Sequence, residues 1–281
     1  MNASSQSENH QARVNEFFLN QTAGWRDLYG DPNVRSDTFR ERQAAVLDWA
    51  TDAAHASARR VLEVGCGAGF VTIELARRGC DVVAVDSVSS MVEMTRRHAD
   101  TAGVGARVAA QVGDANALGF PPAAFDVAVA NGVLPWVADP AVTIAELARV
   151  VVPGGHVIVT TGNRAALILM LPPFTTPLVG PVKRWVRRTA ARLGVARGFL
   201  ASSLATYHYP WYVDRLLAQA GFIKVRSTSL GFGPCTLFGR TFLPDSVGKV
   251  LNGWLGGLAR RSTPLVRAAG ITYLVHARKP R

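Results

Sequence analysis

Hydrophobic and polar residues alternate in two rhythms between Arg60 and Thr161. Short, nearly continuous apolar runs are typical of strands buried on both faces of a sheet, and they read VLEV, DVVAVD, ARVAAQVGDA, FDVAVANGV and HVIVTTG. Segments with helical spacing separate them, namely FVTIELARRG, SVSSMVEMTRRHADTAG and PAVTIAELARVVVPGG. This alternation predicts an α/β fold with a doubly wound, mostly parallel sheet and helices on both faces.

The expected helix ends rest on local signals. The first helix is expected to end at Gly79, and Ser87 to Ser90 offer side chains that can cap the second. The third is expected to stop at the Pro-Gly-Gly turn of residues 153–155, so that His156 begins the next strand.

The regions on either side break this rhythm. Apolar positions from Val14 to Tyr29 and from Thr38 to Ala50 predict helices, whereas residues 164–204 are an insertion with an apolar, proline-punctuated half and a basic half. The α/β pattern returns in PWYVDRLLAQAG, FIKVRSTSLG and TYLVHAR. We expect four parts, which are a helical lid (1–58), the α/β core (59–163), a helical cap (164–205) and the completion of the core (206–281).

A glycine loop follows the first strand in VLEVGCGAGF. Gly65, Gly67 and Gly69 would let a ligand approach the backbone at the carboxyl end of that strand. Their spacing is Gly-x-Gly-x-Gly, whereas the dinucleotide fingerprint has two residues before its third glycine. Glu63 lies two residues before the first glycine, where a carboxylate would repel phosphate but can pair with an ammonium group. The loop therefore favours a cationic, non-phosphorylated ligand.

Two further acids come at the ends of the next strands. Asp86 ends DVVAVD, where a carboxylate can accept both hydroxyls of a ribose across the same crevice. Asp114 ends the third strand in QVGDA and is placed to accept from an adenine amino group. Either acid can also serve a purely structural purpose, Asp86 as a helix cap and Asp114 as a turn residue.

The segments VLEVGCGAGF, VVAVD, VGDA, FDVAVANGVLPWV and LARVVVPGGHVIV, in that order, resemble the class I S-adenosylmethionine-dependent methyltransferases. The resemblance implies the Rossmann-like methyltransferase fold, with S-adenosyl-L-methionine as the cofactor of the core. It implies that the glycine loop lines the methionine end of the cofactor, that Asp86 binds the ribose and Asp114 the adenine, and that Asn131 and Gly132 bind the amino-acid moiety. The implied cofactor-binding residues are Glu63, Gly65, Cys66, Gly67, Gly69, Asp86, Ser87, Met91, Asp114, Ala115, Asn131 and Gly132. The glycine loop and Asn131–Gly132 can also be turns that bind nothing.

The N-terminal segment FFLNQTAGWRDLYGDPNV more weakly resembles the magnesium-protoporphyrin O-methyltransferases, through an early aromatic pair and a Trp-x-x-x-Tyr-Gly stretch. As a lid, its aromatic residues would cover the cofactor and exclude water; otherwise they belong to an amphipathic helix packed on the sheet. After the fourth strand many relatives carry a histidine-rich segment, whereas this chain has LPWV, which removes one customary base. The expected substrate-binding residues are Phe18, Trp25, Tyr29, Trp136 and Tyr207.

The cap is the part of the chain where the family commonly builds its substrate site. Its apolar half and the basic amphipathic run KRWVRRTAARLGVAR are together typical of an interfacial membrane anchor. Residues 165–197 are therefore a candidate for peripheral membrane contact, and a solvated cationic face over a buried one is the alternative. No recognised nucleic-acid motif accompanies the basic run, so we expect no nucleic-acid partner.

A general base is needed only if the nucleophile must lose a proton before methyl transfer. His208, between Tyr207 and Tyr209, is the catalytic candidate because an imidazole titrates near neutrality. A histidine between two tyrosines can equally be a hydrogen-bonded packing residue.

Composition limits the remaining choices. The chain has 281 residues and a formal net charge of +11, which suits nucleic acid, an anionic membrane or an anionic substrate. Its three cysteines, Cys66, Cys80 and Cys235, match no zinc or disulfide spacing, so we expect no metal and a reducing, cytoplasmic location, with membrane association open. The N-terminus shows no secretory signal, and four prolines argue against a spanning helix in 165–182.

These observations favour one function. The chain is expected to be an S-adenosylmethionine-dependent methyltransferase that acts on a small, hydrophobic acceptor, with oxygen as the preferred target atom and direct displacement as the mechanism. The alternatives are a nicotinamide-dependent oxidoreductase on a Rossmann-type fold and a non-catalytic, membrane-docking module that keeps the fold.

Overall fold

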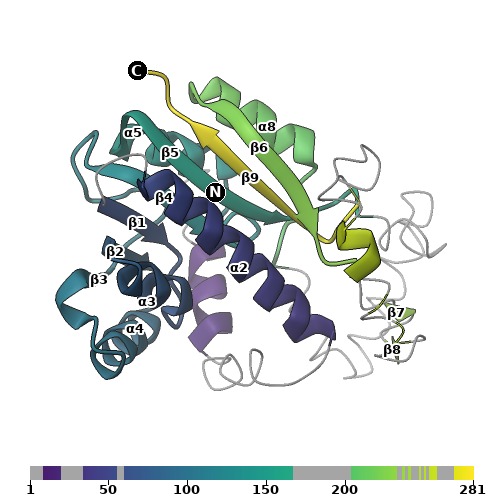
Figure 1. The fold of residues 1–281 in the computed structure, drawn as a ribbon, viewed down its shortest axis with the longest axis horizontal. Coiled ribbons are helices and arrows are strands. Elements are labelled where there is room, and N and C mark those ends of the chain that lie inside the picture. Colours follow the sequence, from purple (N-terminus) through teal and green to yellow (C-terminus); the bar gives the residue numbers. More distant parts are fainter. Residues whose placement is uncertain are drawn as a thin grey trace.

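A computed structural model describes residues 9–19, 34–55, 60–166, 204–232, 236–237, 240–241, 247, 250, 253–257 and 269–281. Its centre is a seven-stranded sheet in the order β3-β2-β1-β4-β5-β9-β6 (Figure 1). Strands β1 to β5 run parallel, and β9 is antiparallel to both of its neighbours. The strands are β1 (Arg60–Val64), β2 (Asp81–Asp86), β3 (Val108–Val112), β4 (Phe125–Asn131), β5 (Val151–Gly162), β6 (Ile223–Leu230) and β9 (Thr272–Arg278). The expected doubly wound, mostly parallel sheet is confirmed.

Helices cover both faces of this sheet (Figure 1). They are α2 (Val34–His55), α3 (Phe70–Arg77), α4 (Ser89–Thr101), α5 (Pro140–Val150) and α8 (Pro210–Gln219), with a 3-10 turn η1 (Gly105–Arg107). Further described elements are a helix over residues 9–19, a helical turn over 253–257, and the two-stranded β7 (Thr236–Leu237) and β8 (Arg240–Thr241). Among the helices that the structure describes, none has the length and apolarity needed to cross a bilayer.

The alternation of side chains along each strand divides the core into two apolar layers. On one face, α2 and α3 pack against Val127, Val129 and Ile158. On the other face, α5 and α8 pack against Ala128, Val157 and their neighbours. Both layers consist of fully buried side chains, which is why the strands read as continuous apolar runs.

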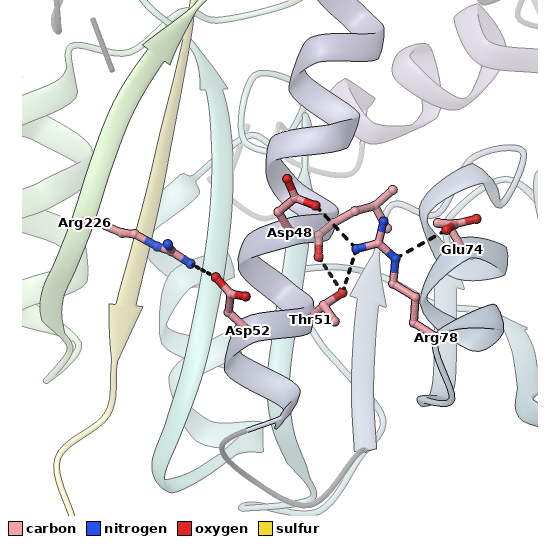
Figure 2. Close-up of polar contacts among 7 residues, drawn as sticks. Asp48, Thr51, Asp52, Glu74, Arg78 and Arg226 are labelled. Atoms are coloured by element: carbon pink, nitrogen blue, oxygen red, sulfur yellow. Dashed lines mark hydrogen bonds and ion pairs between the residues drawn. The ribbon is translucent and has the colours of Figure 1, made fainter. Parts of the chain in front are cut away.

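Helix α2 lies across one face of the sheet and is fastened near its carboxyl end from two sides (Figure 2). Arg226 of β6 pairs with Asp52 at 2.9 Å, and its guanidinium group lies over the ring of Trp49. Arg78, which caps α3, contacts Asp48 at 3.5 Å and donates to Thr51 at 3.1 Å (Figure 2). These contacts fix α2 at the amino edge of the sheet, while its first half extends towards the carboxyl edge.

Several boundaries differ from the sequence prediction. The third helix ends at Val150 and β5 begins at once, so the Pro-Gly-Gly turn lies within the strand and His156 is not its first residue. The reason is a register irregularity against β4, where Gly155 has the Asp126 carbonyl at 2.7 Å from its would-be Cβ. The first helix ends at Arg77, two residues before Gly79.

The remaining differences concern caps and helix lengths. Helix α4 has Val88 as its N-cap without a side-chain cap from any serine, because the Asp86 carboxylate accepts from the Val88 amide at 2.9 Å instead. Helix α2 is longer than the expected span of 38–50, and β3 is shorter than its apolar run. The expected helix from Val14 to Tyr29 is a helix over 9–19, and residues 20–33 lie outside the described part.

Candidate functional site

The glycine loop joins β1 to α3 and has a left-handed backbone at each glycine. The φ angles of Gly65, Gly67 and Gly69 are +70°, +53° and +81°, values that a residue with a side chain adopts only with strain. At Gly65 a Cβ would also lie 2.4 Å from Val133, and at Gly69 it would lie 2.8 Å from the methyl group of Thr95. At Gly67 a Cβ would meet no protein atom within 4 Å. The loop is therefore packed at both ends and open to a ligand in its middle.

Two neighbouring elements hold the middle of the loop. Asp86, at the end of β2, accepts from the amide of Gly67 at 2.9 Å through one oxygen and from the Val88 amide through the other. Thr95 of α4 donates to the Gly67 carbonyl at 2.9 Å, and its hydroxyl also lies 3.6 Å from the buried Cys66 thiol. Burial is the main cause that raises the pKa of both Asp86 and Cys66. The loop is thus fixed before any ligand binds.

Glu63 lies beneath the loop on β1 and is only 2% exposed. Its carboxyl group accepts a hydrogen bond from the Thr72 hydroxyl of α3. Burial is the main cause that raises the pKa of Glu63 to about 8. The hydrogen bonds from Thr72 lower this pKa, and the charge of Asp86 raises it. Without a cation nearby, the group therefore stays largely protonated at neutral pH.

The residues around the loop fit an adenosyl cofactor of positive charge. The open space above Gly67 leaves room for a ligand against the backbone, and each oxygen of Asp86 keeps a lone pair that can accept from a ribose hydroxyl. Two carboxyl groups with raised pKa values gain from a nearby cation and not from a phosphate. The fit rests on these features of the loop alone.

The end of β4 supplies a second group of contacts that converge on Gly132. The amide of Gly132 donates to the Thr160 hydroxyl at 2.7 Å, and that hydroxyl donates to the side chain of Asn131 at 3.0 Å. The guanidinium group of Arg42 on α2 lies 3.3 Å from the position of a Cβ on Gly132. Sequence reasoning missed Arg42, since nothing in an amphipathic helix far from the glycine motif singles out one arginine. It brings a positive charge to the edge where a carboxylate of the cofactor would lie.

The helix over residues 9–19 contacts the end of β2 through polar side chains. Ser87 donates to the side-chain oxygen of Asn15 at 2.8 Å, and Gln11 donates to the same oxygen at 2.9 Å and to the Ser87 hydroxyl at 3.3 Å. Because Ser87 follows Asp86 directly, these contacts bring the helix to the rim of the candidate cofactor site. Neither Asn15 nor Gln11 is distinguishable in the sequence from an ordinary solvated position.

The same helix contacts the loop after β4 through aromatic rings. Trp136 stacks on Phe17 with ring centroids 5.5 Å apart and meets Phe18 edge-on at 4.8 Å. His10 adds a hydrogen bond to the Trp136 carbonyl at 3.0 Å. In the sheet, β1 lies between β2 and β4, so a helix that contacts both Ser87 and Trp136 spans the glycine loop. The expected substrate residues Phe18 and Trp136 therefore lie together.

The other expected cofactor residues are Met91, Asp114 and Ala115, which lie after β2 and β3. Met91 is buried in the first turns of α4. Asp114 is exposed two residues beyond β3, and its carboxylate accepts from the Asn116 amide at 2.8 Å, as a turn residue does. Ala115 is half-buried beside it.

His208 lies in a segment that crosses the carboxyl edge between β4 and β5. Its ring is buried, stacks on Tyr212 and bonds through Nε2 to the Leu134 carbonyl at 3.3 Å. Because a carbonyl can only accept, the neutral imidazole carries its proton on Nε2 and leaves Nδ1 as the basic nitrogen. Burial, followed by the charge of Arg164, lowers the pKa of His208. Tyr207 is exposed, and its ring packs on Gly162 at the end of β5.

Some expected residues lie outside the described part of the chain. These are Trp25, Tyr29 and the insertion from 167 onwards, including nearly all of the candidate membrane segment 165–197.

Comparison with known proteins agrees with this geometry. Residues 62–159 match the methyltransferase domain family, and the sheet order with its antiparallel β9 is that of the Rossmann-like methyltransferase fold. Residues 62–159 are therefore similar to the core of the class I S-adenosylmethionine-dependent methyltransferases. S-adenosylmethionine is the cofactor of that family.

Individual relatives are more distant. The ubiquinone biosynthesis O-methyltransferase of Xylella fastidiosa strain M23 is 31% identical over 165 residues, which is 59% of this chain and 65% of that protein. The chain thus spans less than two thirds of the length of this relative. A solved magnesium protoporphyrin IX methyltransferase from Synechocystis PCC 6803 has a TM-score of 0.60 at 15% identity and covers 96% of this chain and 97% of its own. The [4+2]-cyclase SpnF has a TM-score of 0.51 at 21% identity, covering 82% of this chain and 80% of its own. These two likenesses show the fold alone.

Proposed function

We propose that this protein transfers a methyl group from S-adenosylmethionine to an oxygen of a small, hydrophobic acceptor by direct displacement. The observation that carries the proposal is the open glycine loop tied to Asp86, with the buried carboxyl group of Glu63 beneath it. The distant relatives named for O-methylation in ubiquinone biosynthesis support oxygen as the target.

The residues of the loop would bind and orient the cofactor. Asp86 would accept from the ribose hydroxyls while keeping its hydrogen bond to the Gly67 amide. Arg42 would pair with the carboxylate of the methionine moiety beside Gly132, and Glu63 would take up negative charge as the cation arrives. When bound, the cofactor supplies an electrophilic methyl group on a sulfonium sulfur. The protein contributes position and the exclusion of water.

The acceptor would lie on the same edge, under the aromatic residues of the helix over 9–19. Phe17, Phe18 and Trp136 form an apolar wall between that helix and β4, which suits an apolar acceptor. Tyr207 lies on the far side, at the end of β5.

His208 is the candidate general base for a hydroxyl acceptor. Its lowered pKa keeps the imidazole neutral at pH 7, and its hydrogen bond to Leu134 directs the basic Nδ1 away from that carbonyl. If His208 takes the proton, His208→Gln should lower kcat with little change in KM for the cofactor, and the pH dependence below neutrality should disappear. A purely packing role would instead lower the melting temperature and leave the pH profile of the remaining activity unchanged.

The decisive test is cofactor binding by calorimetry on the full chain, with NAD and NADP as competitors. We expect S-adenosylmethionine and S-adenosylhomocysteine to bind, the nicotinamide nucleotides not to bind, and Asp86→Ala to weaken binding by about a hundredfold. Binding that Asp86→Ala leaves unchanged would overturn the assignment of the site. Release of S-adenosylhomocysteine in the presence of phenolic but not amine acceptors then tests the target atom.

A further inference from the structure

The net positive charge of the chain comes from two segments. Residues 164–204 contain seven basic and no acidic residues, and residues 231–271 contain five basic residues and one acidic residue. Together they carry a net charge of +11, which equals the formal net charge of the whole chain. The other residues balance nineteen basic against nineteen acidic side chains. A chain with this distribution is a neutral α/β core with two strongly cationic segments.

Both segments leave and rejoin the sheet at one edge. The first follows Gly162 at the carboxyl end of β5 and returns at Thr206 and His208, whose amides donate to the carbonyls of Pro135 and Gly162. The second connects Leu230 at the end of β6 with Thr272 at the start of β9, and these two residues pair with each other. Thr272 also pairs with Gly162, so all four ends meet at the carboxyl edge of the sheet, the edge that also carries the glycine loop. The charge is therefore attached to the end of the molecule that holds the candidate site.

Large apolar side chains are exposed at the same end. Within the second segment, Val247, Val250 and Trp254 follow helical spacing and are 49%, 75% and 63% exposed, whereas Gly256 is buried. Trp211 is 62% exposed in the first turn of α8, directly after the returning end of the first segment. Single exposed apolar side chains are common on protein surfaces, but several of them at one end of the molecule, next to cationic segments, indicate an interaction surface.

We propose that the carboxyl edge of this protein docks on an anionic phospholipid bilayer, with Val250, Trp254 and Trp211 inserted at the interface. Cationic residues attract the lipid headgroups, and tryptophan is favoured at the boundary between headgroups and acyl chains. Aliphatic side chains on the docking face favour a bilayer over a nucleic acid, whose surface offers phosphates and base edges.

Docking at this edge places the mouth of the candidate site against the membrane, where an apolar acceptor dissolves. This consequence rests on the proposed function, but the docking itself does not, because vesicle binding is measured without turnover. Loss of methyl transfer with intact vesicle binding would therefore contradict only the function.

The test is co-flotation of the full chain with vesicles of phosphatidylglycerol and phosphatidylcholine in equal parts, compared with phosphatidylcholine alone. We expect binding to the anionic vesicles that weakens as salt rises, and at least about tenfold weaker binding to the neutral ones. Val250→Gln/Trp254→Gln should weaken anionic binding by about tenfold or more, and Trp211→Gln should weaken it further.

A matched control comes from the opposite edge of the sheet. Ile223 and Val225 on β6 are 63% and 54% exposed, so Ile223→Thr/Val225→Thr removes comparable exposed apolar surface without touching the docking edge. This control should bind vesicles as the parent chain does, and all variants should keep the parent's affinity for S-adenosylhomocysteine and its melting temperature. Equal losses in both double variants would overturn the proposal. So would absence of vesicle binding together with a gel shift of duplex DNA or RNA, or with a dimer that Trp254→Gln dissociates.

Discussion

At the two edges of the central sheet, burial shifts the pKa values of ionisable groups in opposite directions. At the carboxyl edge, burial raises the pKa of Glu63 to about 8 beneath a loop that leaves open space above Gly67. At the amino edge, burial and neighbouring charges lower the pKa of His276 on β9 to about 4. One edge thus keeps an acid protonated, and the other keeps a base unprotonated.

The groups at the amino edge satisfy one another in a directed chain of hydrogen bonds. Arg226 donates to Asp52 at 2.9 Å and to Nδ1 of His276 at 3.4 Å. Because an arginine only donates, neutral His276 carries its proton on Nε2 and donates to Nδ1 of His156 at 2.9 Å. Protonating either histidine would break one of these bonds and place a positive charge beside Arg226 or Arg278.

The surroundings of the two buried groups distinguish a candidate binding site from a contact that stabilises the fold. A group that is buried among its own partners, as His276 is, serves the fold, and its altered pKa appears as pH-dependent stability. A group such as Glu63, buried beside open space, can ionise when a cationic ligand binds, and we expect its altered pKa to appear as pH-dependent binding. Four predictions test this contrast.

The largest effects are expected in the glycine loop. Gly67→Ala should weaken binding of S-adenosylhomocysteine by about a hundredfold, since its methyl group would occupy the open space, at a stability cost of about 1–2 kcal/mol from the left-handed backbone. Gly65→Ala should cost more stability because its Cβ would lie 2.4 Å from Val133. Calorimetric titration and chemical denaturation measure the two quantities.

Gly103→Ala is the matched control for this prediction. Gly103 has a φ of +70° and its Cβ would likewise meet no atom within 4 Å, but it lies in the turn after α4. It should show the strain without any loss of affinity. Equal affinities for Gly67→Ala and Gly103→Ala would contradict a ligand site above the loop.

The next effect is the acid sensitivity of the fold. The pKa of His276 is lower in the folded chain than its ordinary 6.5, so the stability it provides is complete above pH 6.5 and is lost as the pH falls towards 4. His276→Gln can still accept from Arg226 and donate to His156, and it should remove about 1–3 kcal/mol of this pH dependence. Urea denaturation of both chains at pH 7 and pH 4.5 measures it; parallel losses in the two chains would argue against the directed chain of bonds.

Glu63 should show the opposite sign in stability and a proton effect in binding. Its folded pKa is raised from 4.5 to about 8, so its contribution to stability falls as the pH rises through that range. A cationic cofactor should lower this pKa and release up to about one proton per site at pH 7. Calorimetry in two buffers of different ionisation enthalpy counts the proton, and Glu63→Gln should bind without releasing it. Proton uptake by the parent chain would contradict the assigned role.

The smallest effects belong to the ion pairs that fasten α2. Asp48→Asn should change the free energy of unfolding by no more than about 0.5 kcal/mol, because its contact with Arg78 is long and exposed. Arg226→Ala should cost about 1–2 kcal/mol, since it also loses the stacking on Trp49 and the bond to His276. A larger effect for Asp48 than for Arg226 in thermal denaturation would reverse this ranking.

Sequence patterns predicted the centre of the sheet well because β1, β4 and β9 are buried on both faces. The run FDVAVAN is almost continuously apolar, so both faces of the strand carry apolar side chains. In the structure all of its residues except the last are buried. The final strand TYLVHAR was located to the residue for the same reason. The glycines and Asp86 were likewise recognisable, since a left-handed loop at a strand end allows few residue types.

Contacts between distant segments were beyond such patterns. Arg42 lies beside Gly132 only because α2 crosses the sheet, and Asn15 meets Ser87 only because the helix over 9–19 spans the loop. The serine side chains predicted to cap α4 make no such bond, and the Asp86 carboxylate, two residues before the N-cap Val88, accepts from the Val88 amide instead. Local chemistry offers several partners for such groups, and tertiary packing chooses among them.

The position of β9 between β5 and β6 also bears on how the chain acquires its fold during synthesis. Strand β6 is made before β9 but has β9 as its neighbour in the sheet, so it has no pairing partner until residues 272–278 have left the ribosome. Until then one side of β5 has no neighbouring strand, and His156 lacks its hydrogen-bond partner His276. The strands that hold the glycine loop can assemble well before that moment. The half of the sheet around the candidate site is thus free to form first. The last strand then completes the hydrogen bonds among His156, His276 and Arg226 at the amino edge.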